Sequence, residues 1–229
     1  MKKKISIISQ NRAYDGYLKI DEAVINEADG SDNIQYSRFR LVRPDAVAVI
    51  LYNEDEDKVY LVRQHRYPIH DRIDGDVLEL AAGKIDKGED PKAAAIREVE
   101  EEIGFKIQDG KIGLLNEFFA SPGYSSEKIY LFYATVKISD RVNAGGGVAG
   151  EHENISVESF GVSEFFDMVA NGDIVDSKTL IGAQALWHLR NQDVVAAGRK
   201  FVEERNLAHA KKIADQVINE GDNAEEDTK

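Results

Sequence analysis

The 229-residue sequence predicts an α+β fold, in which a mixed β-sheet carries helices on its faces and follows a small antiparallel β unit. Three observations lead to this prediction. Alternating or β-rich segments recur between residues 17 and 80, a helical segment follows at 91–103, and the apolar spacing lengthens after residue 160. Strands around one central helix, followed by terminal helices, are typical of a sheet covered by helices.

The first predicted element is the N-terminal antiparallel unit. Apolar and polar residues roughly alternate over residues 17–26 and 34–42, which is the spacing of half-buried strands. Residues 27–32 between them are rich in Asp and Gly, as in turns. We therefore expect residues 1–42 to form a β unit.

A β-hairpin and a third strand come next. Residues 46–52 and 59–62 are rich in β-branched and aromatic side chains, and the acidic segment 53–57 separates them. Such a polar segment between two apolar runs predicts a solvated loop between paired strands. Residues 77–80 give another short strand.

The central helix has clear boundary signals. Asp90 can cap the first turn, and Pro91 fits the first helical position. Good helix formers continue to Ile103, and Gly104 supplies a C-terminal stop. The sequence therefore predicts one helix over residues 91–103.

The remaining chain is predicted to return to strands and then to helices. The predicted strands are 112–119, 128–136 and 155–160. The predicted helices are a short one capped by Ser163, one at 180–189 and a last one at 202–218. A main domain is therefore expected over 43–218, followed by an acidic tail at 219–229.

The composition excludes several functions. Basic residues number 29 and acidic residues 42, the net charge is −13, and residues 2–4 are the only basic run, so we expect no nucleic acid partner. The absence of cysteine excludes disulfides, zinc fingers and a cysteine nucleophile. No apolar run approaches the width of a bilayer, and we expect no membrane partner and a cytoplasmic location.

The predicted central helix carries a cluster of acids. Glu98 and Glu102 lie four residues apart on one face with Glu101 beside them, whereas Val99 and Ile103 face the core. We expect no cation between the three carboxylates. Like charges repel, so such a cluster is favourable only in full solvent or beside divalent metal ions. A solvated acidic face is therefore the alternative to a metal site.

These acids stand in a longer pattern: Gly, five residues, Glu, seven residues, then Arg-Glu-apolar-any-Glu-Glu-any-Gly-apolar. Its fixed positions are Gly83, Glu89, Arg97, Glu98, Val99, Glu101, Glu102, Gly104 and Phe105. The pattern resembles the signature of the Nudix hydrolases. The resemblance implies a Nudix-type α/β/α sandwich, a magnesium site made by Glu98, Glu101 and Glu102, and an Arg97–Glu89 pair.

The resemblance also implies that the backbone carbonyl of Ala82 is a further metal ligand. A pyrophosphate carries about two negative charges and four nearby carboxylates add about four, so about two or three Mg²⁺ ions are expected, with Mn²⁺ as an alternative ion. These ions make attack by an oxygen nucleophile feasible.

A carboxylate outside the helix is expected to take the proton of the attacking water. Glu151 and Glu153 follow glycines at 145–147 and 150, which we expect to let this loop close. The nucleoside-diphosphate-sugar branch of the Nudix enzymes has a similar Glu-x-Glu segment. The resemblance implies that one of the two residues is the base and that Glu153 is a metal ligand, although the order is open. Glu101 is a further catalytic candidate, and a charged loop tip is the alternative.

The substrate follows from resemblance to ADP-ribose pyrophosphatases and GDP-mannose hydrolases. Arg66 matches an arginine that contacts the diphosphate sugar, and Glu127 matches a substrate-contacting glutamate. The resemblance implies hydrolysis of a nucleoside diphosphate sugar by a homodimer whose N-terminal strands cross to the partner. Another Nudix substrate, or a non-catalytic sugar-nucleotide sensor, is the alternative.

Overall fold

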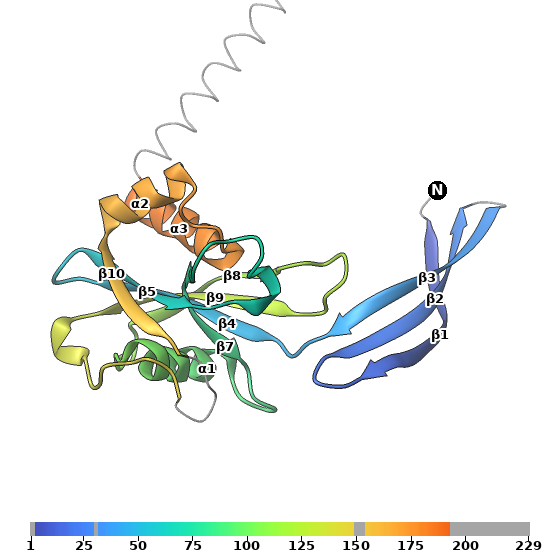
Figure 1. The fold of residues 1–229 in the computed structure, drawn as a ribbon, viewed down its shortest axis with the longest axis horizontal. Coiled ribbons are helices and arrows are strands. Elements are labelled where there is room, and N and C mark those ends of the chain that lie inside the picture. The colour runs from blue at the N-terminus through green and yellow to red at the C-terminus, as the bar shows by residue number, and fades with distance from the viewer. Residues whose placement is uncertain (1–2, 30–31, 149–153, 193–229) are drawn as a thin grey trace, which may run out of the picture. The chain divides into compact units, whose positions relative to one another are not determined.

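The computed structural model describes residues 3–29, 32–148 and 154–192 (Figure 1). The strands are β1 Lys4–Asp15, β2 Lys19–Asp29, β3 Asp32–Val42, β4 Ala46–Asn53, β5 Lys58–Gln64, β6 Val77–Glu79, β7 Ala81–Lys84, β8 Ile112–Phe119, β9 Lys128–Val136 and β10 Ser156–Gly161. The helices are α1 Pro91–Glu98, the π-helix Val99–Ile103, α2 Val162–Asn171 and α3 Ser177–Arg190, with short 3-10 turns at Tyr67–Ile69 and Ile138–Asp140. No helix among the described residues is long and apolar enough to cross a membrane.

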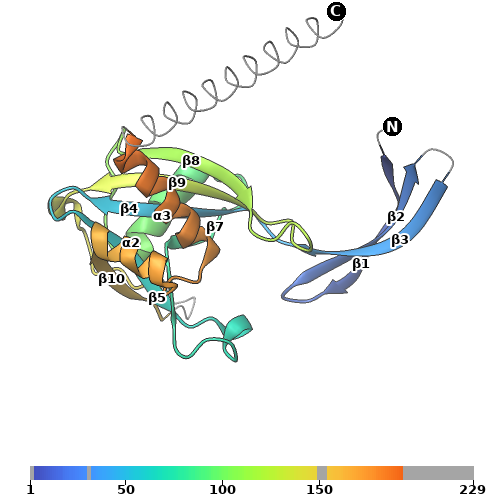
Figure 2. The ribbon, with the colours of Figure 1, turned by 90° about the horizontal axis from the view of Figure 1, so that it is seen from above.

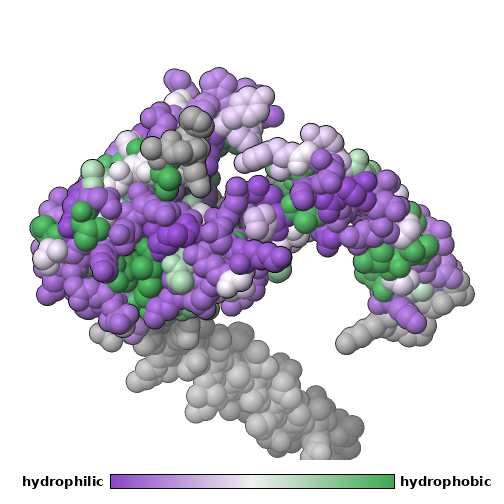
Figure 3. Space-filling model, turned by 90° about the horizontal axis from the view of Figure 1, so that it is seen from below, coloured by the Kyte–Doolittle hydropathy of each residue, from purple (hydrophilic) through white to green (hydrophobic). Residues whose placement is uncertain are grey.

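The N-terminal unit is a three-stranded antiparallel sheet in the order β1-β2-β3. The sequence predicted β2 and β3 but not β1, whose exposed side chains on both faces give it no amphipathic pattern. Apolar side chains lie scattered among polar ones on this sheet (Figure 3). Within residues 3–42 as described, the one buried side chain is that of Asp21.

The main sheet has seven strands, with the principal order β10-β5-β4-β9-β8. Strands β4 and β9 run parallel, whereas the other neighbouring strands are antiparallel. The predicted mixed sheet, preceded by a small antiparallel unit, is therefore confirmed.

Strands β4 and β5 separate soon after their hairpin, and this divergence makes room for the site. They pair only at residues 51–53 of β4. Beyond that point β6 pairs with β5 and β7 pairs with β4, with Leu80 between the two short strands. Residues 77–84 thus lie between the separated ends of β4 and β5. Their backbone pairs first with β5, through β6, and then with β4, through β7.

Helices cover both faces of the main sheet (Figures 1 and 2). Helix α1 packs on β4 and β7 from one side, where its Ala94 and Ala95 are fully buried together with Val47, Val49 and Leu51 of β4. On the other side, a Cβ at Gly182 of α3 would stand 2.8 Å from Leu80 Cδ1. Glycine therefore lets this helix approach the sheet closely.

The helix boundaries correct three predictions. The predicted helix 91–103 changes to a π-helix at Val99, where a wider turn of the backbone ends at Gly104 in the left-handed conformation. Ser163 does not cap α2, because the helix begins at Val162 and Gly161 is its N-cap. The predicted helix at 180–189 begins earlier, at Ser177. The predicted helix 202–218 and the tail 219–229 lie outside the described residues.

Candidate active site

The loop before α1 is held on the helix by one arginine. Arg97 donates to the two carboxylate oxygens of Glu89 at 3.0 and 3.1 Å and to the carbonyl of Lys84 at 3.1 Å. Glu89 also accepts from the backbone N–H of Asp86 at 2.9 Å, and Asp90 caps α1 as the sequence predicts. The expected Arg97–Glu89 pair is thus present in the geometry.

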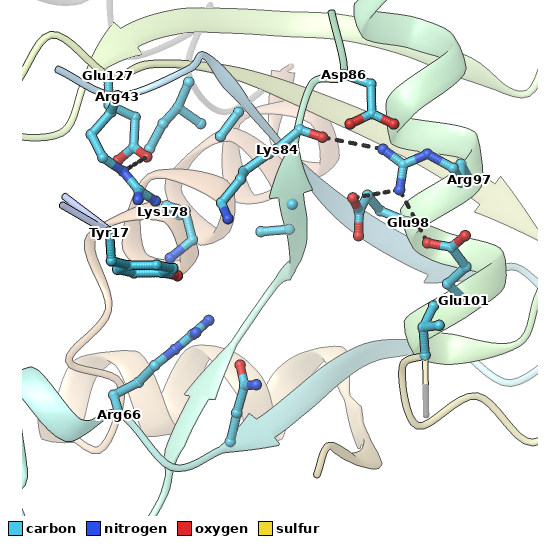
Figure 4. A pocket seen from close by; sticks show the side chains of 16 residues that line it. Tyr17, Arg43, Arg66, Lys84, Asp86, Arg97, Glu98, Glu101, Glu127 and Lys178 are labelled. Carbon is cyan, nitrogen blue, oxygen red and sulfur yellow. Dashed lines mark hydrogen bonds and ion pairs between the residues drawn. The ribbon is translucent and has the colours of Figure 1, made fainter. Parts of the chain in front are cut away.

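Arg97 also stands between two of the clustered acids, contrary to the expectation that no cation lies there. Its Nη1 donates to Glu98 at 2.8 Å and to Glu101 at 3.1 Å (Figure 4). The reason is that the planar guanidinium has enough donors to serve Glu89 and the helix acids at once. One cation therefore serves three carboxylates, and the cluster keeps an excess of negative charge.

Glu98 and Glu102 are packed against β7. Glu102 is buried and accepts from the backbone N–H of Ala82 at 2.9 Å. Glu98 is also buried, and a Cβ at Gly83 would stand 2.0 Å from its carboxylate oxygen. Glycine at 83 is therefore required for the strand and the carboxylate to lie this close. The predicted ligand residues Ala82, Glu98 and Glu102 come together at this contact.

Hydrogen bonding changes the pKa values in this network. The hydrogen bond to Glu89 raises the pKa of Arg97, with partial burial acting in the opposite direction. The pKa of Glu89 is lowered by Arg97 and then by the Asp86 N–H. Both groups are therefore held in their charged forms.

A cavity of about 650 Å³ opens beside the acids. Its acidic side carries Asp86, Glu98 and Glu101, whereas Arg66 and Lys178 lie across it (Figure 4). The expected substrate residues Arg66 and Glu127 both line this cavity. The cavity therefore has two different walls, one with the carboxylates of Asp86, Glu98 and Glu101 and one with the cations Arg66 and Lys178.

The two expected substrate residues are each held by a partner. Arg66 donates to Glu79, with Nε at 3.0 Å from Oε1, and Glu127 accepts from Arg43 at 3.4 Å. Sequence reasoning missed Arg43, Lys84 and Lys178 as lining residues. Lys178 lies 95 positions after Gly83, where the box begins, in a helix without a local motif, so no nearby sequence signal identifies it as a lining residue.

The glycine-rich segment after β9 packs against the end of the π-helix. Its backbone binds the end of the π-helix: Gly146 N donates to Glu102 O at 2.8 Å, and Gly147 N donates to Glu101 O at 3.0 Å. A Cβ at Gly145 would stand 2.4 Å from Glu102 O, and φ there is +73°. Gly145 is therefore required by close backbone packing. The expected closure of the segment that follows stays a prediction.

Asn143 completes this contact. Its side-chain oxygen accepts from Gly145 N at 2.7 Å, and its amide nitrogen lies 3.3 Å from the carbonyl of Glu100. The segment that leads to Glu151 and Glu153 thus starts from the carboxyl end of the acidic helix. Glu151 and Glu153 themselves lie outside the described residues.

Residues 42–180 match the NUDIX domain. The chain belongs to the Nudix family. This Nudix chain is 32% identical over 184 residues to a GDP-mannose pyrophosphatase of Citrobacter koseri, which covers 79% of the chain and 94% of the relative. It is 37% identical over 155 residues to a methanol dehydrogenase activator of Bacillus methanolicus, covering 67% of the chain and 78% of that protein.

The fold of this Nudix chain is also found in a crystal structure of an ADP compounds hydrolase. The two structures align with a TM-score of 0.67 at 20% sequence identity, over 82% of this chain and 96% of the other. The family resemblance that the box predicted, and the fold expected from it, are confirmed.

Nudix hydrolases use a divalent cation such as Mg²⁺. The donor set of this chain fits a hard cation, because Glu98, Glu101 and Glu102 offer carboxylate oxygens and Ala82 offers a carbonyl beside them. Among the described residues, no three acidic or histidine side chains already converge as a metal site.

Proposed function

We propose that this Nudix chain hydrolyses the pyrophosphate bond of nucleoside diphosphate sugars, with GDP-mannose and ADP-ribose as leading substrates. The products would be a nucleoside monophosphate and a sugar phosphate. One observation carries the proposal: a single cavity has carboxylates for divalent ions on one wall and Arg66 and Lys178 on the other. A substrate with a diphosphate linkage needs both, since it must be bound as an anion and then attacked.

The roles we assign follow the two walls. Ala82, Glu98 and Glu102, together with Glu153, would hold about two or three Mg²⁺ ions, or Mn²⁺ in their place. These ions neutralise the diphosphate and acidify a bound water. Glu101 also lies at the cavity, with its carboxylate paired to Arg97, and is a further candidate for accepting the proton of the water.

The substrate side of the cavity is assigned to Arg66 and Glu127. The Arg66 guanidinium offers a planar set of donors to the diphosphate. Glu127 would accept from hydroxyl or amine groups of the substrate. Tyr17 also lines the cavity, and its ring could stack on a nucleobase.

A substrate panel tests this function. GDP-mannose, ADP-ribose, UDP-glucose and diadenosine polyphosphates are incubated with the purified chain, with and without Mg²⁺, and the products are separated by chromatography. We expect Mg²⁺-dependent turnover, with GDP-mannose or ADP-ribose as the best substrate and a nucleoside monophosphate as product. Binding of these compounds without any product would overturn hydrolysis and favour the sensor.

The general base is proposed to be Glu151 or Glu153. If Glu151 is the base, Glu151→Gln should lower kcat by about a hundredfold while the Mg²⁺ concentration for half-maximal rate barely moves. Glu153→Gln, as loss of a ligand, should instead raise that Mg²⁺ concentration. Reversed results would exchange the two roles. If both variants keep the parent rate, this segment carries no chemistry, and Glu101 and Glu127 are tested next.

We also propose that the chain is a homodimer through its N-terminal unit at residues 1–42. Large apolar side chains, among them Ile5, Ile7 and Phe39, are more than half exposed there. A second copy could cover them. Sedimentation of the full chain and of a variant with Ile5 and Ile7 changed to Ser tests this. A monomer in both would overturn it. The expected cytoplasmic location stays a prediction.

A further inference from the structure

The cationic wall of the cavity is organised around one buried carboxylate. Glu79, the last residue of β6, is 5% exposed, and both of its oxygens accept from Arg66. Lys178 Nζ lies 3.8 Å from Glu79 Oε2. We propose that Glu79 is a positioning residue that fixes Arg66 and Lys178 for the diphosphate of the substrate. This inference rests on the proposed function.

Lys178 has a second anchor. Its Nζ lies 2.7 Å from Asp176, which also accepts from the backbone N–H of Thr179 at 2.9 Å. The side chains of Lys178, Asp176 and Glu79 are all largely buried, at 16%, 11% and 6% exposure. The ammonium group is thus held by two largely buried carboxylates.

Without a shared carboxylate, the positive charges of Arg66 and Lys178 would repel each other, and the two side chains would move apart. Coulomb repulsion grows as water is excluded, and each long side chain has many rotamers to lose when it binds substrate. A buried carboxylate between Arg66 and Lys178 removes part of the repulsion and fixes both side chains before the substrate arrives. Preorganisation of this kind improves binding because less ordering remains to be done.

The same short segment also reaches the acidic wall. Leu80, next to Glu79, donates its backbone N–H to the buried Thr179 hydroxyl at 2.9 Å, and that hydroxyl donates to Asp176 at 2.8 Å. Two residues further on, Ala82 donates to Glu102. Residues 79–82 therefore connect the cations that would bind the diphosphate to the carboxylates that would hold the metal ions, and set the distance between the two groups.

The first test is Glu79→Gln, which keeps the shape but removes the charge. We expect KM for the best nucleotide sugar to rise about tenfold or more, with kcat reduced less than about threefold, because ground-state and transition-state binding are lost together. The Mg²⁺ concentration for half-maximal rate should stay within about twofold, since Glu98 and Glu102 are unchanged. Unchanged KM would overturn the proposal.

Two matched variants separate charge from structure. Glu158→Gln removes the carboxylate of a second two-point arginine pair, with Arg63, which does not line the cavity, and KM should change less than about twofold. Glu79→Asp keeps the charge but shortens the side chain. If Glu79 acts through charge, this variant should bind substrate better than Glu79→Gln. If it serves only to fill space, the shorter Asp should be the worse of the two.

A binding measurement makes the proposal independent of turnover. Isothermal titration with methylenediphosphonate and Mg²⁺ should show about tenfold weaker binding for Glu79→Gln and no loss for Glu158→Gln. Circular dichroism confirms folding of each variant. If wild type binds the diphosphonate with this pattern but hydrolyses no nucleotide sugar, the proposed function fails and the role of Glu79 stands. If wild type is active and Glu79→Gln equals it in both assays, the proposed function stands and the role of Glu79 fails.

Discussion

The three-stranded N-terminal sheet and the seven-stranded main sheet differ in what their side chains bury. Five consecutive residues of β4, Val47–Leu51, have no solvent exposure, and helices cover both faces of this sheet. All of β1 is exposed, and the buried residue of the described N-terminal sheet is the charged Asp21. The main sheet is stabilised by apolar burial, whereas the N-terminal sheet depends on backbone hydrogen bonds and ion pairs.

The two sheets also treat buried carboxylates differently. Asp21 accepts from Arg12 at 2.6 Å, Arg40 at 2.9 Å and Gln10 at 3.0 Å, so two cations serve one acid. In the candidate active site the ratio is reversed, because one cation, Arg97, serves Glu89, Glu98 and Glu101. Excess cations suit a structural cluster, and excess carboxylates suit a site that recruits divalent ions. Substitutions in each cluster test this distinction.

The largest effect is expected at Glu102, a buried acid of the main sheet. Glu102→Gln keeps the side-chain shape and a partner for the Ala82 N–H but removes one negative charge. Turnover should fall by about a hundredfold or more while the fold stays intact. Steady-state rates at saturating Mg²⁺, with circular dichroism as a check of folding, measure this. Near-normal turnover would remove Glu102 from the metal cluster.

Glu100 provides the matched control. It occupies the unspecified position of the Nudix box, two residues before Glu102. Glu100→Gln also removes one negative charge from this helix, so it tests whether overall charge alone matters. The change in kcat should be less than about threefold. An equal loss in both variants would show that position in the cluster is irrelevant.

A smaller effect is expected where the glycine-rich segment packs on the acidic helix. Gly145→Ala would place a Cβ 2.4 Å from Glu102 O at a φ of +73°, so the segment must move. We expect a loss of about 1–3 kcal/mol in the free energy of unfolding and about tenfold in kcat, because Glu102 and the chain leading to Glu151 shift together. Gly113→Ala in β8, where a Cβ meets open space, is the control and should be nearly neutral.

The features that the sequence predicted are those with local causes. Asp90 and Pro91 start α1 through contacts within one turn, and the box spacing brings Glu89 to Arg97 across a short loop. The fold class followed because apolar spacing records which faces are buried. These predictions needed no knowledge of the tertiary structure.

The features that were missed depend on contacts between distant segments. Lys178 enters the cavity because Thr179 of α3 binds the backbone of Leu80, and nothing near residue 178 signals this. The packing of Gly145 on Glu102 was missed because glycine is common in both hinges and close contacts, and only packing distinguishes the two. Strand β1 was missed because its partner β2, rather than its own apolar pattern, defines it.

The smallest effect on catalysis is expected from the buried acid of the N-terminal sheet. Asp21→Asn removes the charge that Arg12 and Arg40 share, leaving two neighbouring cations without their common carboxylate. Amide hydrogen exchange in β1 and β2 should become faster, because this sheet has no apolar core to compensate. The kcat should stay within about twofold of wild type, since none of the proposed metal ligands is touched. A large loss of kcat would show that the two sheets are not independent.

The pH dependence sharpens this last prediction. Hydrogen bonds from Arg40, and then from Arg12, lower the pKa of Asp21 in the folded chain, with burial opposing them. A lowered pKa stabilises the sheet fully above the unfolded value of about 3.9, and this stabilisation is lost as the pH falls through the lower folded value. The Asp21→Asn variant lacks this stabilisation at every pH. Hydrogen exchange in β1 and β2 should therefore differ most between the two proteins above about pH 4 and converge in stronger acid. A difference that persists in stronger acid would show that Asp21 acts through packing rather than charge.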